Sequence, residues 1–252
     1  MNKKVFISIL SVCVLSCLFS TGLFADILPD WIVPLREAVY SQNLKADGVE
    51  KLAKASEKEA RMRLSGFALD IALCRIEYFK GRAYQNDKKN DDAVKHFESA
   101  IKFAEKSLKI EQTASAYELI SASTMELCKI KDRAWVLARQ GDIQKNADLS
   151  LALNGGSGGA QFLSKSRWVF SGGTYADMTR GVSEMSDLLN KNPNLQKDDL
   201  FNINMTIAYA YLVQKKTKEA EPWLKKALEY YPTNQYAADL LSGKIILTKD
   251  SI

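Results

Sequence analysis

The feature that most constrains the fold is a fixed order of small and large side chains across residues 74–107. Small residues stand where two antiparallel helices would cross closely, and aromatic rings stand where they would fill the space beside the crossing. A unit of this kind cannot bury its apolar face alone, so the pattern predicts a stack of helix pairs. The small residues are Gly81, Ala93 and Ala100, and the large ones are Tyr84 and Phe97.

The same order returns near the C-terminus, across residues 201–234. Two copies of one register so far apart in the chain are typical of a repeat architecture. The residues that match the first copy, followed by a proline at the end of the unit, are Ala208, Tyr211, Ala220, Leu224, Ala227 and Pro232.

Both segments resemble the tetratricopeptide repeat, a helix pair of about 34 residues. The resemblance implies an all-α fold, a right-handed superhelical solenoid of about five helix pairs. Weaker copies of the register lie near residues 30–63, 115–148 and 162–195. Residues 67–73 are expected to extend the helix of the next repeat. An amphipathic stretch at residues 235–248 is predicted to form a C-terminal capping helix.

The copy at residues 115–148 departs from the family pattern. Ala138 stands where the register usually has a large residue, and Gly141 follows where it has a small one. With Ala134 also small, the two helices of this pair are predicted to sit closer together than in the others.

Residues 1–25 have the composition of a secretory signal peptide. A short basic head with Lys3 and Lys4 precedes a stretch that is almost wholly apolar, and Ala25 ends a peptidase site. We expect cleavage after Ala25, which makes residues 26–252 an exported bacterial repeat domain of the periplasm or cell envelope. Two alternatives stay open. One is an uncleaved membrane anchor, and the other is a lipid anchor at Cys17 in a loose lipoprotein signal.

The charge of the exported chain argues against nucleic acid as a partner. Loss of Lys3 and Lys4 leaves 33 of the 35 basic residues against 30 acidic ones. Such a small excess, spread along helices rather than gathered in blocks, supplies little attraction to a phosphate backbone.

Two cysteines remain in the exported chain, Cys74 and Cys128. The register places them at opposite ends of neighbouring helices, roughly 20 Å apart at ~1.5 Å per residue. A disulfide needs Cα atoms within about 7 Å of each other, so we expect two buried free thiols.

Glycines gather at residues 154–159, directly before a helix that is predicted to begin near Ala160. Backbone N–H groups of such a loop could cradle a phosphate. No lysine follows in the P-loop spacing and no strand precedes the loop, so a linker between helices is favoured.

No catalytic constellation is evident, and the chain is not expected to be an enzyme. His96 is the single histidine, and its register position beside Phe97 favours an edge residue rather than a catalyst. Histidine and cysteine are too few for a transition-metal site, so no metal or cofactor is expected. The alternative that stays open is a hydrolase whose carboxylates converge in the irregular region 155–173.

The resemblance implies a concave groove lined by the first helix of each repeat. The groove would present arginine, aromatic and amide side chains, which suit binding of an extended peptide or an exposed helix. The residues that the family register places in this groove are Trp31, Arg75, Tyr78, Arg82, Asn86, Glu126, Ser166, Asn202 and Tyr209. Replacing Arg75 and Arg82 by alanine is therefore expected to abolish partner binding and leave the melting temperature unchanged.

Three functions follow as hypotheses. The first is a non-enzymatic scaffold of the cell envelope that binds a protein or peptide partner. The second resembles the repeat proteins that accompany TRAP transporters and dock a solute-binding protein, and an enclosed apolar channel would favour it. The third is the hydrolase.

Overall fold

The computed structural model describes residues 28–154, 157–170, 174–192 and 195–248, and all regular secondary structure in these ranges is helical. The predicted all-α solenoid is therefore confirmed, whereas the predicted signal peptide lies outside the described residues. No helix in these ranges is long and apolar enough to cross a bilayer. The helices are α2 (Val33–Ser41), α3 (Ala46–Arg63), α4 (Gly66–Asn86), α5 (Asn90–Leu108), α6 (Ala114–Cys128), α7 (Arg133–Leu153), α8 (Gly158–Phe170), α9 (Tyr175–Lys191), α10 (Lys197–Val213), α11 (Thr217–Tyr230) and α12 (Gln235–Leu241).

Helices α4 and α5 nest through the small residues that the register singled out. A Cβ atom added to Gly81 would lie 2.6 Å from the ring of Phe97, so the helix crossing leaves no room for a side chain there. Ala93 and Ala100 are fully buried on the facing side of α5. The extension before this repeat is also present, because α4 begins at Gly66.

Side-chain caps fix where several helices begin. Thr113 accepts a hydrogen bond from the backbone N–H of Ala116, Asp132 from that of Trp135 and Thr174 from that of Asp177. Each cap satisfies a backbone donor that the first turn of a helix leaves free, and so holds the start of its helix in register.

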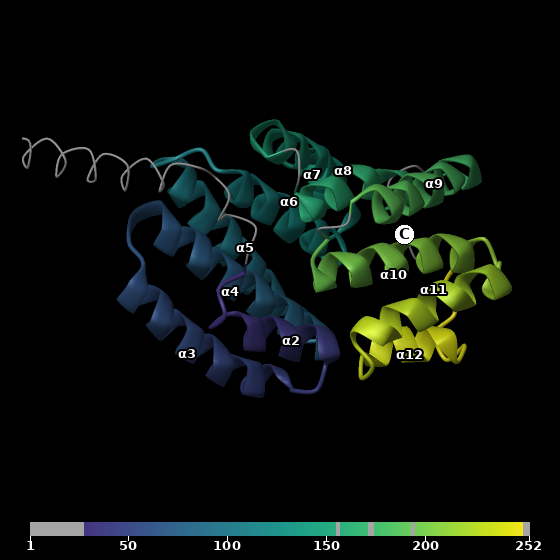
Figure 1. Ribbon diagram of the computed structural model, residues 1–252, viewed down its shortest axis with the longest axis horizontal. Helices are drawn as coiled ribbons and strands as arrows, with labels where there is room; N and C mark the ends of the chain where they lie inside the picture. The colour runs from purple at the N-terminus through teal and green to yellow at the C-terminus, as the bar shows by residue number, and fades with distance from the viewer. Residues whose placement is uncertain (1–27, 155–156, 171–173, 193–194, 249–252) are drawn as a thin grey trace, which may run out of the picture.

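The stack of helix pairs curves until its first helix meets its last ones, as Figure 1 shows for α2 and the pair α11 and α12. The ring of Tyr40 on α2 stacks on Tyr231, which follows α11, with ring centroids 5.1 Å apart. The Nδ2 atom of Asn234 donates to the backbone oxygen of Tyr40 at 2.7 Å. Thr233 donates to the backbone oxygen of Ser41 at 2.6 Å. The array is therefore closed rather than open between its ends.

Two predicted details are wrong. The capping helix α12 has seven residues and ends at Leu241 rather than at residue 248. Gly243 takes a φ of +72°, a left-handed conformation that stops a helix. In α7, Ala134 and Ala138 are exposed instead of packed at a close crossing.

Candidate functional site

Three of the predicted groove residues meet in one buried cluster. On α4, Arg82 donates through Nη1 to the hydroxyl of Tyr78 at 3.1 Å and lies 3.5 Å from the carboxylate of Glu126 on α6. The guanidinium also lies over the ring of Tyr40, 5.1 Å from its centroid. The exposed fractions are 16% for the Arg82 side chain and 2% for that of Glu126. These groups contact one another across the inner face, and the open groove expected there is closed.

The charges of this cluster are balanced inside the protein. Burial opposes ionisation of Glu126, but Arg82 and Lys129 outweigh that effect and hold its pKa below the ordinary value. Burial raises the pKa of Tyr78 to about 12, so its hydroxyl stays protonated near neutral pH. Glu126 is thus an anion that its own neighbours neutralise.

Two predicted asparagines donate hydrogen bonds to α2, one from the last repeat and one from the second. Asn202 on α10 donates through Nδ2 to the hydroxyl of Tyr40 at 3.1 Å. Asn86 at the end of α4 donates to the backbone oxygen of Val39 at 3.1 Å. Beside them, Arg36 on α2 pairs with Asp198 on α10 at 3.2 Å. Asn202 and the pair of Arg36 with Asp198 hold the first repeat against the last, whereas Asn86 joins the first repeat to the second.

Three other predicted residues have contacts of their own. Arg75 donates to the hydroxyl of Ser115 at 3.3 Å. Trp31 packs against the core, and its backbone oxygen accepts from Ser56 at 2.8 Å. Tyr209 lies against Phe170, with ring centroids 5.3 Å apart. Burial raises the pKa of Asp198 and the positive charge of Arg75 lowers it, so Arg75 lies near the contact between α2 and α10, whereas Trp31 packs against the core.

The ninth predicted residue, Ser166, lines a cavity of about 230 Å³ between α6, α7 and α8. Its apolar walls are Met125 and Ile143, with Phe170 of α8. Gln140, Gly141, Gln144 and Arg167 complete the lining. This cavity lies where the third and fourth helix pairs meet.

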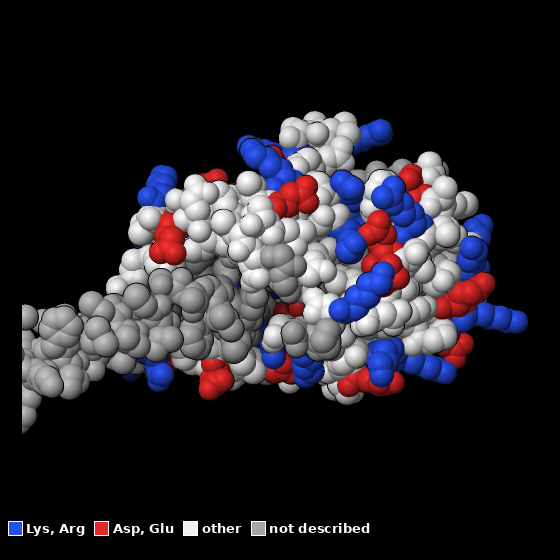
Figure 2. Space-filling view, turned by 45° about the horizontal axis from the view of Figure 1, so that its top comes forward, with Lys and Arg blue, Asp and Glu red and all other residues white. Residues whose placement is uncertain are grey.

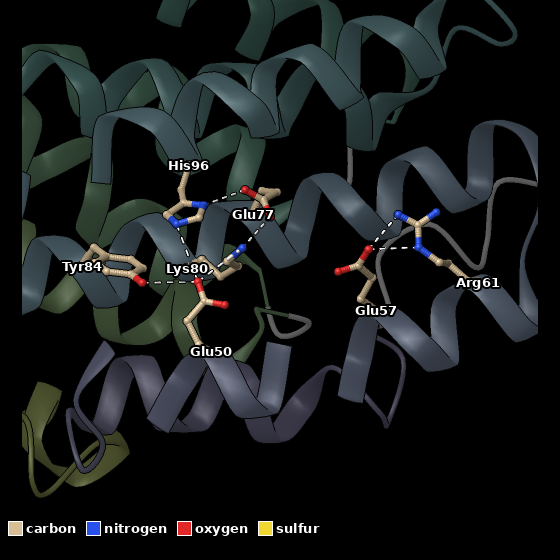
Figure 3. Close-up of polar contacts among 7 residues, drawn as sticks. All are labelled: Glu50, Glu57, Arg61, Glu77, Lys80, Tyr84 and His96. Atoms are coloured by element: carbon tan, nitrogen blue, oxygen red, sulfur yellow. Dashed lines mark hydrogen bonds and ion pairs between the residues drawn. The ribbon is translucent and has the colours of Figure 1, made fainter. Parts of the chain in front are cut away.

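His96 belongs to a polar network that ties the first repeat to the second (Figure 3). Its Nδ1 atom lies 2.7 Å from a carboxylate oxygen of Glu77, and Nε2 lies 3.7 Å from Glu50 on α3. Lys80 contacts both carboxylates, at 2.9 and 3.4 Å, and the ring of Tyr84 stacks on the imidazole. These contacts give His96 a structural role between three helices. Nowhere in the described ranges do three metal-ligating side chains gather.

The first two residues of α8 are glycines that allow close approach of neighbouring side chains. A Cβ atom on Gly158 would lie 2.7 Å from a carboxylate oxygen of Asp199, and one on Gly159 would collide with Glu118. Ser157 donates a short hydrogen bond to Glu118. Two carboxylates therefore face the positive end of α8, where the helix dipole stabilises them. Their negative charge would repel a phosphate. Asp199 belongs to the capping box of α10. Glu118 accepts from Ser157, which accepts from the backbone N–H of Ala160, so both carboxylates have structural partners.

Sequence reasoning missed the residues that make the cavity, Met125, Gln144 and Arg167. The sequence signal for the cavity is Gly141, which is exposed in the middle of α7. Glycine destabilises a helix interior, so its presence there indicates a position where a side chain would be in the way. The predicted close packing at Gly141 is wrong, because the structure leaves open space beside this residue.

Comparison with known families agrees with the geometry of the helix pairs. A family model of the tetratricopeptide repeat matches residues 78–111 and 201–234. The match at 201–234 has the bounds of the predicted repeat there. The match at 78–111 begins four residues after the start of the predicted repeat at 74–107. No curated protein matches the chain.

Proposed function

The chain is a tetratricopeptide repeat protein, and on that premise we propose that it is a non-enzymatic scaffold of the bacterial cell envelope. Arrays of helix pairs present extended surfaces to other proteins, and these repeats support a protein-interaction scaffold in general. The partner is proposed to bind in the cavity between α6, α7 and α8.

The observation that carries this proposal is the hollow at the third and fourth helix pairs. Among the other predicted groove residues, Arg82 and Glu126 contact each other, and Asn202 contacts Tyr40. At the cavity, Ser166 lies beside the apolar side chains of Met125 and Phe170, which offer contact area to an incoming group.

Export and an envelope location are part of the proposal. They are supported by the basic head and apolar stretch of residues 1–25, which have the composition of a leader. The mass of the mature N-terminus distinguishes cleavage after Ala25 from a lipid at Cys17 and from an uncleaved anchor.

Site-specific photo-crosslinking in intact cells tests the proposal. A photoreactive residue is placed at Gln140 on the cavity rim, and a matched one at Lys58, which is exposed on α3. We expect a discrete protein adduct from position 140 in the envelope fraction and none from position 58. No adduct from position 140, or the same adducts from both positions, would contradict the proposal.

A second candidate is a component that accompanies a TRAP transporter and docks its solute-binding protein. An enclosed channel needs an array that closes on itself, and α2 does contact α10 and Asn234, although these contacts are polar rather than apolar. Mass spectrometry of the adduct separates the two. A periplasmic solute-binding protein supports this candidate, and an envelope assembly protein supports the first.

A further inference from the structure

We propose that the cavity between α6, α7 and α8 receives one bulky apolar side chain from an acidic segment of the partner protein. This inference rests on the proposed function and adds the chemistry of the partner. It requires an apolar chamber, an open entrance, a polar group that accepts from the incoming chain, and a positive rim.

The chamber is large enough for one side chain. Its volume is about 230 Å³, and a cavity of ~150 Å³ lined by apolar side chains already holds a benzene molecule. Met125, Ile143 and Phe170 form the apolar walls. Methionine is flexible, so Met125 can adapt its shape to a leucine, methionine or phenylalanine.

The entrance lies beside Gly141. No atom lies within 4 Å of a Cβ built on this residue, so the space in front of it is open. Leu137 lies one helical turn earlier on the same face of α7, and 61% of its surface is exposed. Apolar surface therefore continues from Leu137 to the cavity, where an incoming helix or strand could lie.

Gln144 supplies an acceptor in the lining. Its Nε2 atom donates to Asp148 at 2.6 Å and to Ser164 at 2.9 Å. Its Oε1 atom is buried and has no hydrogen-bond partner among the described residues. An unpaired buried acceptor costs free energy, and a backbone N–H of the bound segment would satisfy it.

Positive charge borders the cavity on the side of α8 and α9. Arg167 stacks on the ring of Trp168, 4.6 Å from its centroid, and Arg180 stacks on the same ring at 3.7 Å. Lys165 and Arg180 share the carboxylate of Glu184, and no ion pair joins Arg167 to a carboxylate of the described residues. On the face that Figure 2 draws, basic side chains lie beside acidic ones.

Neither nearby acid of the neighbouring helix α7, which the structure describes in full, forms an ion pair with Arg167, although Asp148 keeps its negative charge because its donors are neutral. On α7, Asp142 pairs with Arg139 at 3.3 Å, and Asp148 accepts from Gln144 and Ser164. Arg167 can therefore offer its planar donors to a carboxylate of the partner, placed near the apolar anchor.

The test follows the methyl signal of Met125 by NMR in the full chain. One probe is a synthetic amphipathic peptide with a single leucine among glutamates, and the matched probe has lysines in place of the glutamates. We expect the glutamate peptide to shift the Met125 signal and leave Met62, exposed on α3, unchanged. Equal shifts by both peptides, or a shift by neither, would overturn the inference.

Three variants sharpen the test. Arg167→Glu is expected to weaken binding of the glutamate peptide at least about tenfold, as loss of a charged contact implies. Gly141→Leu should block the entrance without a clash in the folded chain. Lys58→Glu makes the same charge change on α3 and should have no effect. Equal weakening by Lys58→Glu and Arg167→Glu would show general charge attraction and overturn the inference.

Anionic phospholipid vesicles are a further probe. Binding to vesicles that depends on Arg167, with no response to either peptide, would assign the rim to a membrane and overturn the inference. The inference can also fail alone. If position 140 crosslinks to a protein but the glutamate peptide does not bind, the scaffold function stands and the acidic partner does not.

Discussion

The guanidinium of Arg82 lies 3.5 Å from the carboxylate of Glu126 and joins α4 to α6 inside the array. Tyr78 accepts a hydrogen bond from the same guanidinium, and Tyr40 lies beneath it. These residues hold successive repeats together. The groove expected from the sequence implies that substitution of Arg82 leaves the melting temperature unchanged. The structure predicts instead that it lowers the melting temperature.

Arg82→Met is predicted to destabilise the fold because it leaves Glu126 charged and buried. Removing one partner of a buried pair costs about 3–5 kcal/mol, and we expect the lower end because Lys129 still contacts the carboxylate at 2.8 Å. Urea denaturation measures the loss. Arg63→Met breaks an exposed pair with Glu59 and should cost about 0–1 kcal/mol. Similar losses in the two variants would contradict the buried pair.

The stability of the protein should fall in acid through Glu126. The pKa of this carboxyl is below its ordinary value of 4.5 in the folded chain, so its contribution is complete above that value. It is lost as the pH falls through the lower, folded pKa. Glu126→Gln should therefore show a shallower loss of stability below pH 4.5 than the wild type. Identical pH profiles would mean that Glu126 titrates normally.

Two glycine substitutions should change stability in opposite directions. Gly81→Ala places a methyl group 2.6 Å from the Phe97 ring and is expected to cost about 1–3 kcal/mol. Gly141→Ala meets no atom within 4 Å and should gain roughly 0.5–1 kcal/mol, since alanine restricts the unfolded chain. Thermal melting of both variants checks this pair. The same sign for both would contradict the packing described for α4 and α7.

The two described cysteines should differ in reactivity. Both are free thiols, but Cys74 is buried whereas Cys128 is half-buried, which corrects the expectation that both are buried. Burial raises the pKa of each thiol, so native labelling should be slow and should accelerate with pH. In a chain with Cys13→Ser and Cys17→Ser, a disulfide reagent should label Cys128 first and Cys74 only on unfolding. Equal rates in the native protein would contradict this assignment.

The nesting of neighbouring helices could be predicted because it depends on residues close in sequence. Gly81 meets Phe97 within one helix pair, and the same spacing marks the pair at residues 201–234. In the fourth pair, a Cβ on Gly181 would lie 2.6 Å from Val169. This glycine occupies the small position equivalent to Ala93, and its spacing could have been recognised.

The closure of the array could not be predicted in the same way. Tyr40 and Tyr231 meet only because small rotations between successive helix pairs add up along the whole stack. The register placed Arg82 in an open groove because position within one repeat does not reveal which side chains the neighbouring repeats bring opposite, here Tyr40 and Glu126. Exposure of Ala138 likewise depends on which helices pack beside α7.

Pulsed electron paramagnetic resonance between the first and last repeats tests the closed array most directly. Spin labels replace Leu44 and Tyr236, whose side chains are 43% and 41% exposed, in a chain without its native cysteines. We predict one narrow, short distance distribution that broadens and lengthens when Tyr40→Ala removes the ring stacked on Tyr231. A broad, long distribution that Tyr40→Ala leaves unchanged would show an open superhelix, with the predicted groove residues free for a partner.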